Sequence, residues 1–82
     1  MRTPPRLADL APGQSATIGS LAADSGLGQR LAALGLRPGQ RVELLRRASW
    51  GGPLHLRVGM TELMLRRRDA ARVDLIALDG AA

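Results

Sequence analysis

The fold is decided by residues 54–65, which read LHLRVGMTELML. Leucine or valine occupies every second position from Leu54 to Val58, and leucine does so again at Leu63 and Leu65. This period of two is typical of strands that bury one face. The dipeptide Gly-Met between the two runs has the length of a tight hairpin turn. The stretch therefore predicts a β-hairpin with one apolar face, and its pattern disfavours a helix.

Three further strands are expected outside this hairpin. Val42 and Leu44 alternate with charged residues in a strand that follows Gln40, and the glycine-rich tip at residues 50–53 joins that strand to the hairpin. A first strand is expected around residues 15–18 and a last one from Val73 to Leu78. One helical turn at residues 68–71 precedes the last strand. The chain thus contains five short strands.

Glycine and proline mark the turns between these elements. Two Pro-Gly dipeptides each precede a strand. Proline presets φ at the first central position of a turn and glycine supplies a positive φ at the second, so both dipeptides predict type II turns. We assign turn-forming roles to Gly13, Gly35, Pro38, Gly39, Gly51 and Pro53.

One short helix is expected between the first two strands. Leu27, Leu31 and Leu34 recur at i, i+4 and i+7, the spacing of one face of a helix. Asp24 or Ser25 is placed to cap the N-terminus of this helix, and Gly35 is placed to end it. Leu36, just beyond that glycine, is the apolar residue that commonly packs back on the last helical turn.

These elements predict an all-β fold with one short helix or two. Five short strands with one apolar face avoid open edges by curling into a small five-stranded SH3-like barrel, with the helix inserted between strands one and two. Because 82 residues form only one small domain, we expect a single domain at residues 7–78. Residues 1–6 are expected to be a disordered N-terminal segment, and residues 79–82 a frayed tail.

The composition leaves few chemistries available. The chain has no cysteine, a single histidine at position 55, and neither a P-loop nor a G-x-G-x-x-G pattern. We interpret His55 as a solvated strand residue, because no general base, nucleophile or repeated ligand spacing accompanies it. No catalytic residue, metal ligand or cofactor is therefore assigned.

The charge favours anionic partners. All twelve basic residues are arginines against seven acids, which gives a formal net charge of +5. Single-stranded nucleic acids are usually bound with several stacked aromatic side chains, and Trp50 is the only aromatic residue, so no nucleic acid partner is expected. No apolar stretch resembles a signal peptide or a membrane span, and a cytoplasmic location is expected.

The order and spacing of these signals resemble the FeoA family, small cytosolic ferrous iron transport proteins with an SH3-like fold. The resemblance runs from Leu7 to about Leu78. It rests on the opening Leu7-Ala8-Asp9-Leu10 with Pro12-Gly13, on residues 29–39 with their Leu-Gly-Leu and Pro-Gly signals, on the Gly51-Gly52-Pro53 hairpin, and on the Leu63-Met64-Leu65-Arg66-Arg67 strand.

The resemblance implies a non-enzymatic accessory of the membrane ferrous iron transporter FeoB, which meets the membrane only through that transporter. We hypothesise that a groove between the helix and the barrel accepts an apolar segment of the transporter's cytosolic GTPase part. The candidate partner-binding residues are Leu27, Arg30, Leu31, Leu34, Leu36 and Trp50.

Several alternatives remain open at this point. Leu31 and Leu36 could fill the barrel core instead of anchoring a partner, and the Trp50 ring could fold back on the barrel wall. The whole chain could instead be a basic KOW-like RNA-binding barrel or a transition-metal-binding regulatory domain. It could also form a homo-oligomer.

Overall fold

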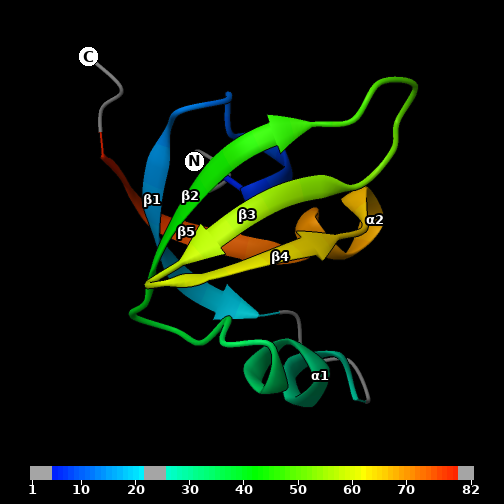
Figure 1. Cartoon of the computed structure of the whole chain (residues 1–82). Helices are drawn as coiled ribbons and strands as arrows, with labels where there is room; N and C mark the ends of the chain where they lie inside the picture. Colours follow the sequence, from blue (N-terminus) through cyan, green and yellow to red (C-terminus); the bar gives the residue numbers. More distant parts are fainter. Residues whose placement is uncertain (1–4, 22–25, 80–82) are drawn as a thin grey trace.

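The computed structural model describes residues 5–21 and 26–79, and Figure 1 shows the course of the chain. Five antiparallel strands form one curled sheet in the order β4-β3-β2-β1-β5. The strands are β1 (Ser15–Leu21), β2 (Arg41–Arg47), β3 (Leu54–Val58), β4 (Thr61–Leu65) and β5 (Val73–Asp79). Between them lie η1 (Leu7–Asp9), α1 (Leu27–Ala33) and α2 (Arg67–Ala70). The predicted all-β fold, with one short helix or two beside the strands, is confirmed.

The core is built by the predicted alternation. In β3 the side chains of Leu54, Leu56 and Val58 point inward, while His55 and Arg57 between them lie on the outer face. The buried apolar side chains come from all five strands and from η1, α1 and α2. No polar or charged side chain of the described residues is buried, so apolar packing holds the sheet and helices together.

The two Pro-Gly turns lie at opposite ends of the β1–β2 ladder. Gly13 has φ +87° and its N–H donates to the Leu44 carbonyl, whereas Gly39 has φ +88° and its N–H donates to the Ile18 carbonyl. The positive φ at the second central position agrees with the predicted type II geometry. Each turn therefore starts a strand and also extends the pairing of the first two strands.

Helix α1 ends in the motif that its sequence predicts. Gly35 has φ +99°, its N–H donates to the Ala32 carbonyl, and the Leu36 N–H donates to the Leu31 carbonyl. This pair of bonds is the Schellman arrangement, which satisfies two carbonyls at the helix end. Asp24 and Ser25, the predicted N-terminal caps, lie outside the described residues, and the N-cap position is occupied by Gly26.

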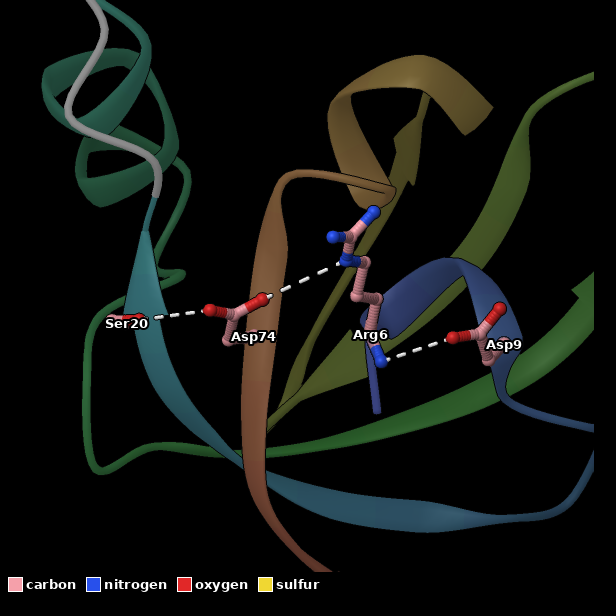
Figure 2. Close-up of polar contacts among 4 residues, drawn as sticks. All are labelled: Arg6, Asp9, Ser20 and Asp74. Carbon is pink, nitrogen blue, oxygen red and sulfur yellow. Dashed lines mark hydrogen bonds and ion pairs between the residues drawn. The ribbon is translucent and has the colours of Figure 1, made fainter. Parts of the chain in front are cut away.

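The N-terminal boundary requires a correction. Residues 5 and 6, predicted to be disordered, lie along the outer edge of β5: the Leu75 N–H donates to the Pro5 carbonyl, and Arg6 pairs with Asp74. Figure 2 shows Asp74 between the Ser20 hydroxyl, which donates to it over 3.3 Å, and the Arg6 guanidinium, whose Nε lies 3.9 Å away. Strand β5 lies at the edge of the sheet, where backbone N–H groups have no neighbouring strand to bind. Residues 5 and 6 supply a hydrogen-bond acceptor for one of these N–H groups.

The C-terminal boundary also shifts slightly. Strand β5 extends to Asp79, where the backbone pairs with Ser15, one residue beyond the predicted end of the domain. Residues 1–4 and 80–82, which belong to the predicted terminal segments, lie outside the described residues. Of the helices that the structure describes, none has the length and hydrophobicity to cross a membrane.

Candidate interaction surfaces

Helix α1 presents little of its leucine stripe to solvent. Leu27, Leu31 and Leu36 are only 2%, 1% and 0% exposed and belong to the core, the alternative that the sequence had left open for Leu31 and Leu36. A side chain already buried in the core is not available to a partner without unfolding the helix. Of the predicted contact residues on and after this helix, Arg30 and Leu34 are exposed, the latter to 45%.

Trp50 lies at the tip of the loop that joins β2 to β3. The Gly52 N–H donates to the Ser49 carbonyl over 3.2 Å, and both central residues, Trp50 and Gly51, have positive φ values of 61° and 75°. Positive φ at both positions is typical of a type I′ turn, which favours asparagine and glycine. The Trp50 side chain is fully exposed, so its ring does not fold back on the barrel wall.

This placement of Trp50 is energetically costly. An L-residue with a Cβ in the left-handed region loses about 1–2 kcal/mol relative to the right-handed region. The exposed indole gains no burial in return. Such strain is characteristic of positions with a role other than folding, and Trp50 is therefore a candidate contact residue.

A groove of about 490 Å³ opens beside this tip, between the β2–β3 loop and α2. We call it the loop–α2 groove. In Figure 1 the loop projects past the sheet at the end where α2 lies, well separated from α1. The surface of the groove is mostly apolar, and its lining residues are Gly51, Gly52, Pro53, Arg66, Arg67, Arg68 and Ala71.

The α2 side of the groove is strongly basic. Arg66, Arg67 and Arg68 are exposed, and none of them makes an ion pair with any side chain in the described part of the protein. The only acid on α2 is Asp69. By contrast, the Arg47 side chain donates a hydrogen bond to the Leu10 carbonyl over 2.6 Å, and this bond connects β2 to the residue that follows η1. The three consecutive guanidinium groups are thus available to an anionic partner.

The outer face of β2, β3 and β4 carries charges that pair with one another. Arg57 Nη2 lies 2.7 Å from Glu43 Oε1 on β2, and His55 Nε2 lies 2.9 Å from Glu62 Oε1 on β4. The hydrogen bond from Arg57 to Glu43, followed by the charge of that carboxylate, raises the pKa of Arg57 above its ordinary value. Glu43 and Glu62 on this face each have a partner within the fold, whereas the arginines of the loop–α2 groove have no acidic partner among the described residues.

The described part of the chain does not bring together enough potential metal ligands to form a metal site. Across residues 5–21 and 26–79, no group of three or more histidine, cysteine, aspartate or glutamate side chains lies close enough to share an ion. His55 and Glu62 supply two donors. Structural and catalytic zinc sites use three or four protein ligands, which these two side chains do not provide.

Sequence reasoning identified the two parts of the loop–α2 groove but did not bring them together. The glycine-proline tip and the run of three arginines are both visible in the sequence. Their adjacency arises because β3 and β4 form a tight hairpin, in which Leu54 pairs with Leu65 and the two ends of the hairpin return to the same place. The predicted tight hairpin of residues 54–65 is therefore the sequence feature from which the groove could have been predicted.

The chain matches the family model of the FeoA domain over residues 6–75. A comparison with curated protein sequences gives no match. Among solved structures, a FeoA from Stenotrophomonas maltophilia, crystallised with zinc and described as a prokaryotic SH3 domain protein, is 29% identical with a TM-score of 0.78, and the match covers 94% of this chain and 98% of that one.

Two further structures extend the comparison. The FeoA protein of Chlorobium tepidum is 31% identical with a TM-score of 0.77, over 93% of this chain and 74% of that chain. A manganese-dependent transcriptional repressor is 20% identical with a TM-score of 0.79, over 93% of this chain but only 44% of the repressor, and it shows the shared fold. The curled five-stranded sheet is therefore an SH3-like fold.

Proposed function

Since this chain belongs to the FeoA family, we propose that it is a non-enzymatic accessory of bacterial ferrous iron transport, which binds the cytosolic part of a FeoB-type transporter in the cytoplasm. The observation that carries the proposal is the family match over residues 6–75, together with a shared fold in relatives named as FeoA proteins. One relative at 30% identity is described as an iron(II) transport protein A; the match covers 85% of this chain and 43% of that one.

The chemistry of the described side chains supports binding rather than catalysis. His55 pairs with Glu62 on the neighbouring strand, and the Ser20 hydroxyl donates to Asp74. Among the described residues, no hydroxyl is hydrogen-bonded to His55. The third group at the Ser20–Asp74 pair is the guanidinium of Arg6, a permanent cation that cannot act as a base. What the surface does offer is an exposed aromatic ring and unpaired guanidinium groups, which are frequent in protein interfaces.

The proposal is tested with the purified cytosolic GTPase part of a FeoB-type transporter from the same bacterium. Complex formation is measured by isothermal titration calorimetry, and GTP hydrolysis is measured with and without this chain. We expect a saturable complex of fixed stoichiometry. The absence of any complex at low and at physiological salt would contradict the proposal. A change in hydrolysis rate would distinguish a regulator from a scaffold.

A further inference from the structure

The loop–α2 groove combines an apolar floor with a basic wall. Gly51, Gly52 and Pro53 form one side without any charge, and Ala71 adds further apolar surface on the other. The arginines at positions 66–68 line the α2 side. A ligand that fits this groove must bring an apolar group to the floor and negative charge to the rim.

Charge complementarity restricts that ligand further. The three arginines form no ion pair with the acids whose side chains the structure describes, which are those at positions 9, 43, 62, 69 and 74. Other arginines do find such partners, as Arg57 does with Glu43. Guanidinium groups bind carboxylates and phosphates alike through two parallel hydrogen bonds, and the apolar surface beside these three suits the carboxylate of a protein segment better than a nucleic acid backbone.

Trp50 supplies the third element of the surface. It directly precedes the lining residue Gly51, and its left-handed backbone holds the indole out in solvent at the groove's edge. Trp is among the residues that contribute most to binding when a partner covers them. A nucleic acid would also be attracted by arginines, but it would place phosphates against an apolar floor and would find one aromatic ring on which to stack.

We propose that the loop–α2 groove is the docking site for an acidic protein segment, which inserts an apolar side chain between the β2–β3 loop and α2 and is covered by Trp50. This inference rests on the proposed function, because the segment is expected within the cytosolic part of the transporter. It assigns docking to this groove, and not to the face of α1, where the leucines are buried.

The test uses the whole chain labelled with 5-fluorotryptophan, which gives one ¹⁹F resonance because Trp50 is the only tryptophan. Adding the transporter's cytosolic part should shift that resonance. Two groove variants, Trp50→Asn and the double variant Arg67→Gln with Arg68→Gln, should each weaken the complex by about tenfold or more in calorimetry. Peptides that tile the cytosolic part should bind only where they are acidic and carry a large apolar residue.

A charge-matched control separates the groove from the net charge. Arg37→Gln with Arg41→Gln removes two exposed arginines at the start of β2, at the opposite end of that strand from the β2–β3 loop, and it should change the affinity by less than about twofold. A complex that survives both groove variants, or that the control weakens equally, overturns the inference and leaves the proposed function intact. If the unaltered chain forms no complex, the proposed function fails and the inference falls with it.

Other occupants would be revealed in the same series. A 20-nucleotide single-stranded RNA, phosphatidylglycerol vesicles and the chain itself at high concentration are each titrated against the ¹⁹F label. If one of these shifts the Trp50 resonance in a manner that Arg67→Gln with Arg68→Gln abolishes, while the transporter part does not, the groove serves that ligand and the inference is overturned.

Discussion

The backbone N–H of Leu36 donates to the carbonyl oxygen of Leu31 over 2.8 Å, and both leucine side chains are buried. This contact closes the C-terminus of α1 and turns its apolar stripe into the core. The leucines from which a docking site on α1 was predicted therefore pack in the core and hold the helix against the rest of the fold.

Leu31→Ala is expected to lower the free energy of unfolding by about 2–5 kcal/mol, because it removes a fully buried side chain and leaves a cavity. Urea denaturation followed by circular dichroism measures the loss. Leu34→Ala, next to the same helix but 45% exposed, is the matched control and should cost less than about 1 kcal/mol. An unchanged midpoint for Leu31→Ala would place Leu31 on the surface instead.

Gly19→Ala is expected to destabilise the protein, because the added Cβ would lie 2.9 Å from Ile76 Cγ1 and 3.2 Å from the Asp74 carbonyl. Strands β1 and β5 approach closely at this point, where their register is irregular. Thermal unfolding checks the effect, which should be about 1–3 kcal/mol.

Gly28→Ala provides the opposite case within the same chain. This glycine lies in α1, where the nearest atom to an added Cβ is Leu21 Cδ1 at 4.0 Å. Replacing glycine by alanine in a helix should raise stability by about 0.5–1 kcal/mol. A rise in melting temperature for Gly19→Ala would contradict the close approach of β1 and β5, and a fall for Gly28→Ala would contradict the open space beside Gly28.

Trp50→Asn should raise the free energy of unfolding by about 0.5–1 kcal/mol, although it removes the largest side chain of the protein. Asparagine tolerates the left-handed region and precedes glycine in the preferred type I′ pair. Chemical denaturation measures the gain. Trp50→Val is the contrasting variant, because a β-branched residue at positive φ keeps the strain and should bring no gain.

The ion pair between Arg57 and Glu43 should not contribute to the pH dependence of protein stability between pH 8 and 11. The pKa of Arg57 is raised by its partner, so the associated stability is fully present below the ordinary pKa of an arginine and is lost only when the pH rises through the higher pKa of the folded state. The difference in melting temperature between the unaltered chain and Glu43→Gln should therefore stay constant over that range. A difference that falls with rising pH would show that Arg57 loses its proton earlier.

Strands and turns could be predicted because they depend on local rules. Alternation at Val42 and Leu44, and the positive φ required after Pro12 and Pro38, are decided by neighbours in the sequence. Helix α1 could be predicted too, but the burial of Leu31 could not. A stripe of leucines has the same spacing whether it meets a core or a partner, and only the packed sheet decides between them.

The remaining features depend on contacts between distant parts of the chain. Arg6 meets Asp74 across 68 positions, and neither residue carries a periodic signal that would reveal the pairing. The loop–α2 groove likewise forms between residues around Gly52 and Arg67, which only the register of β3 with β4 brings together. Charge and turn chemistry identify such residues as exposed, but not as neighbours.

The full exposure of Trp50 has a consequence for spectroscopy. Because the chain contains no tyrosine or phenylalanine, all of its intrinsic fluorescence originates from one indole that water surrounds in the native state. Emission should hardly change when the chain unfolds, so denaturation has to be followed by another signal. A blue shift, when one is seen, will report that another molecule has excluded solvent from the hairpin tip.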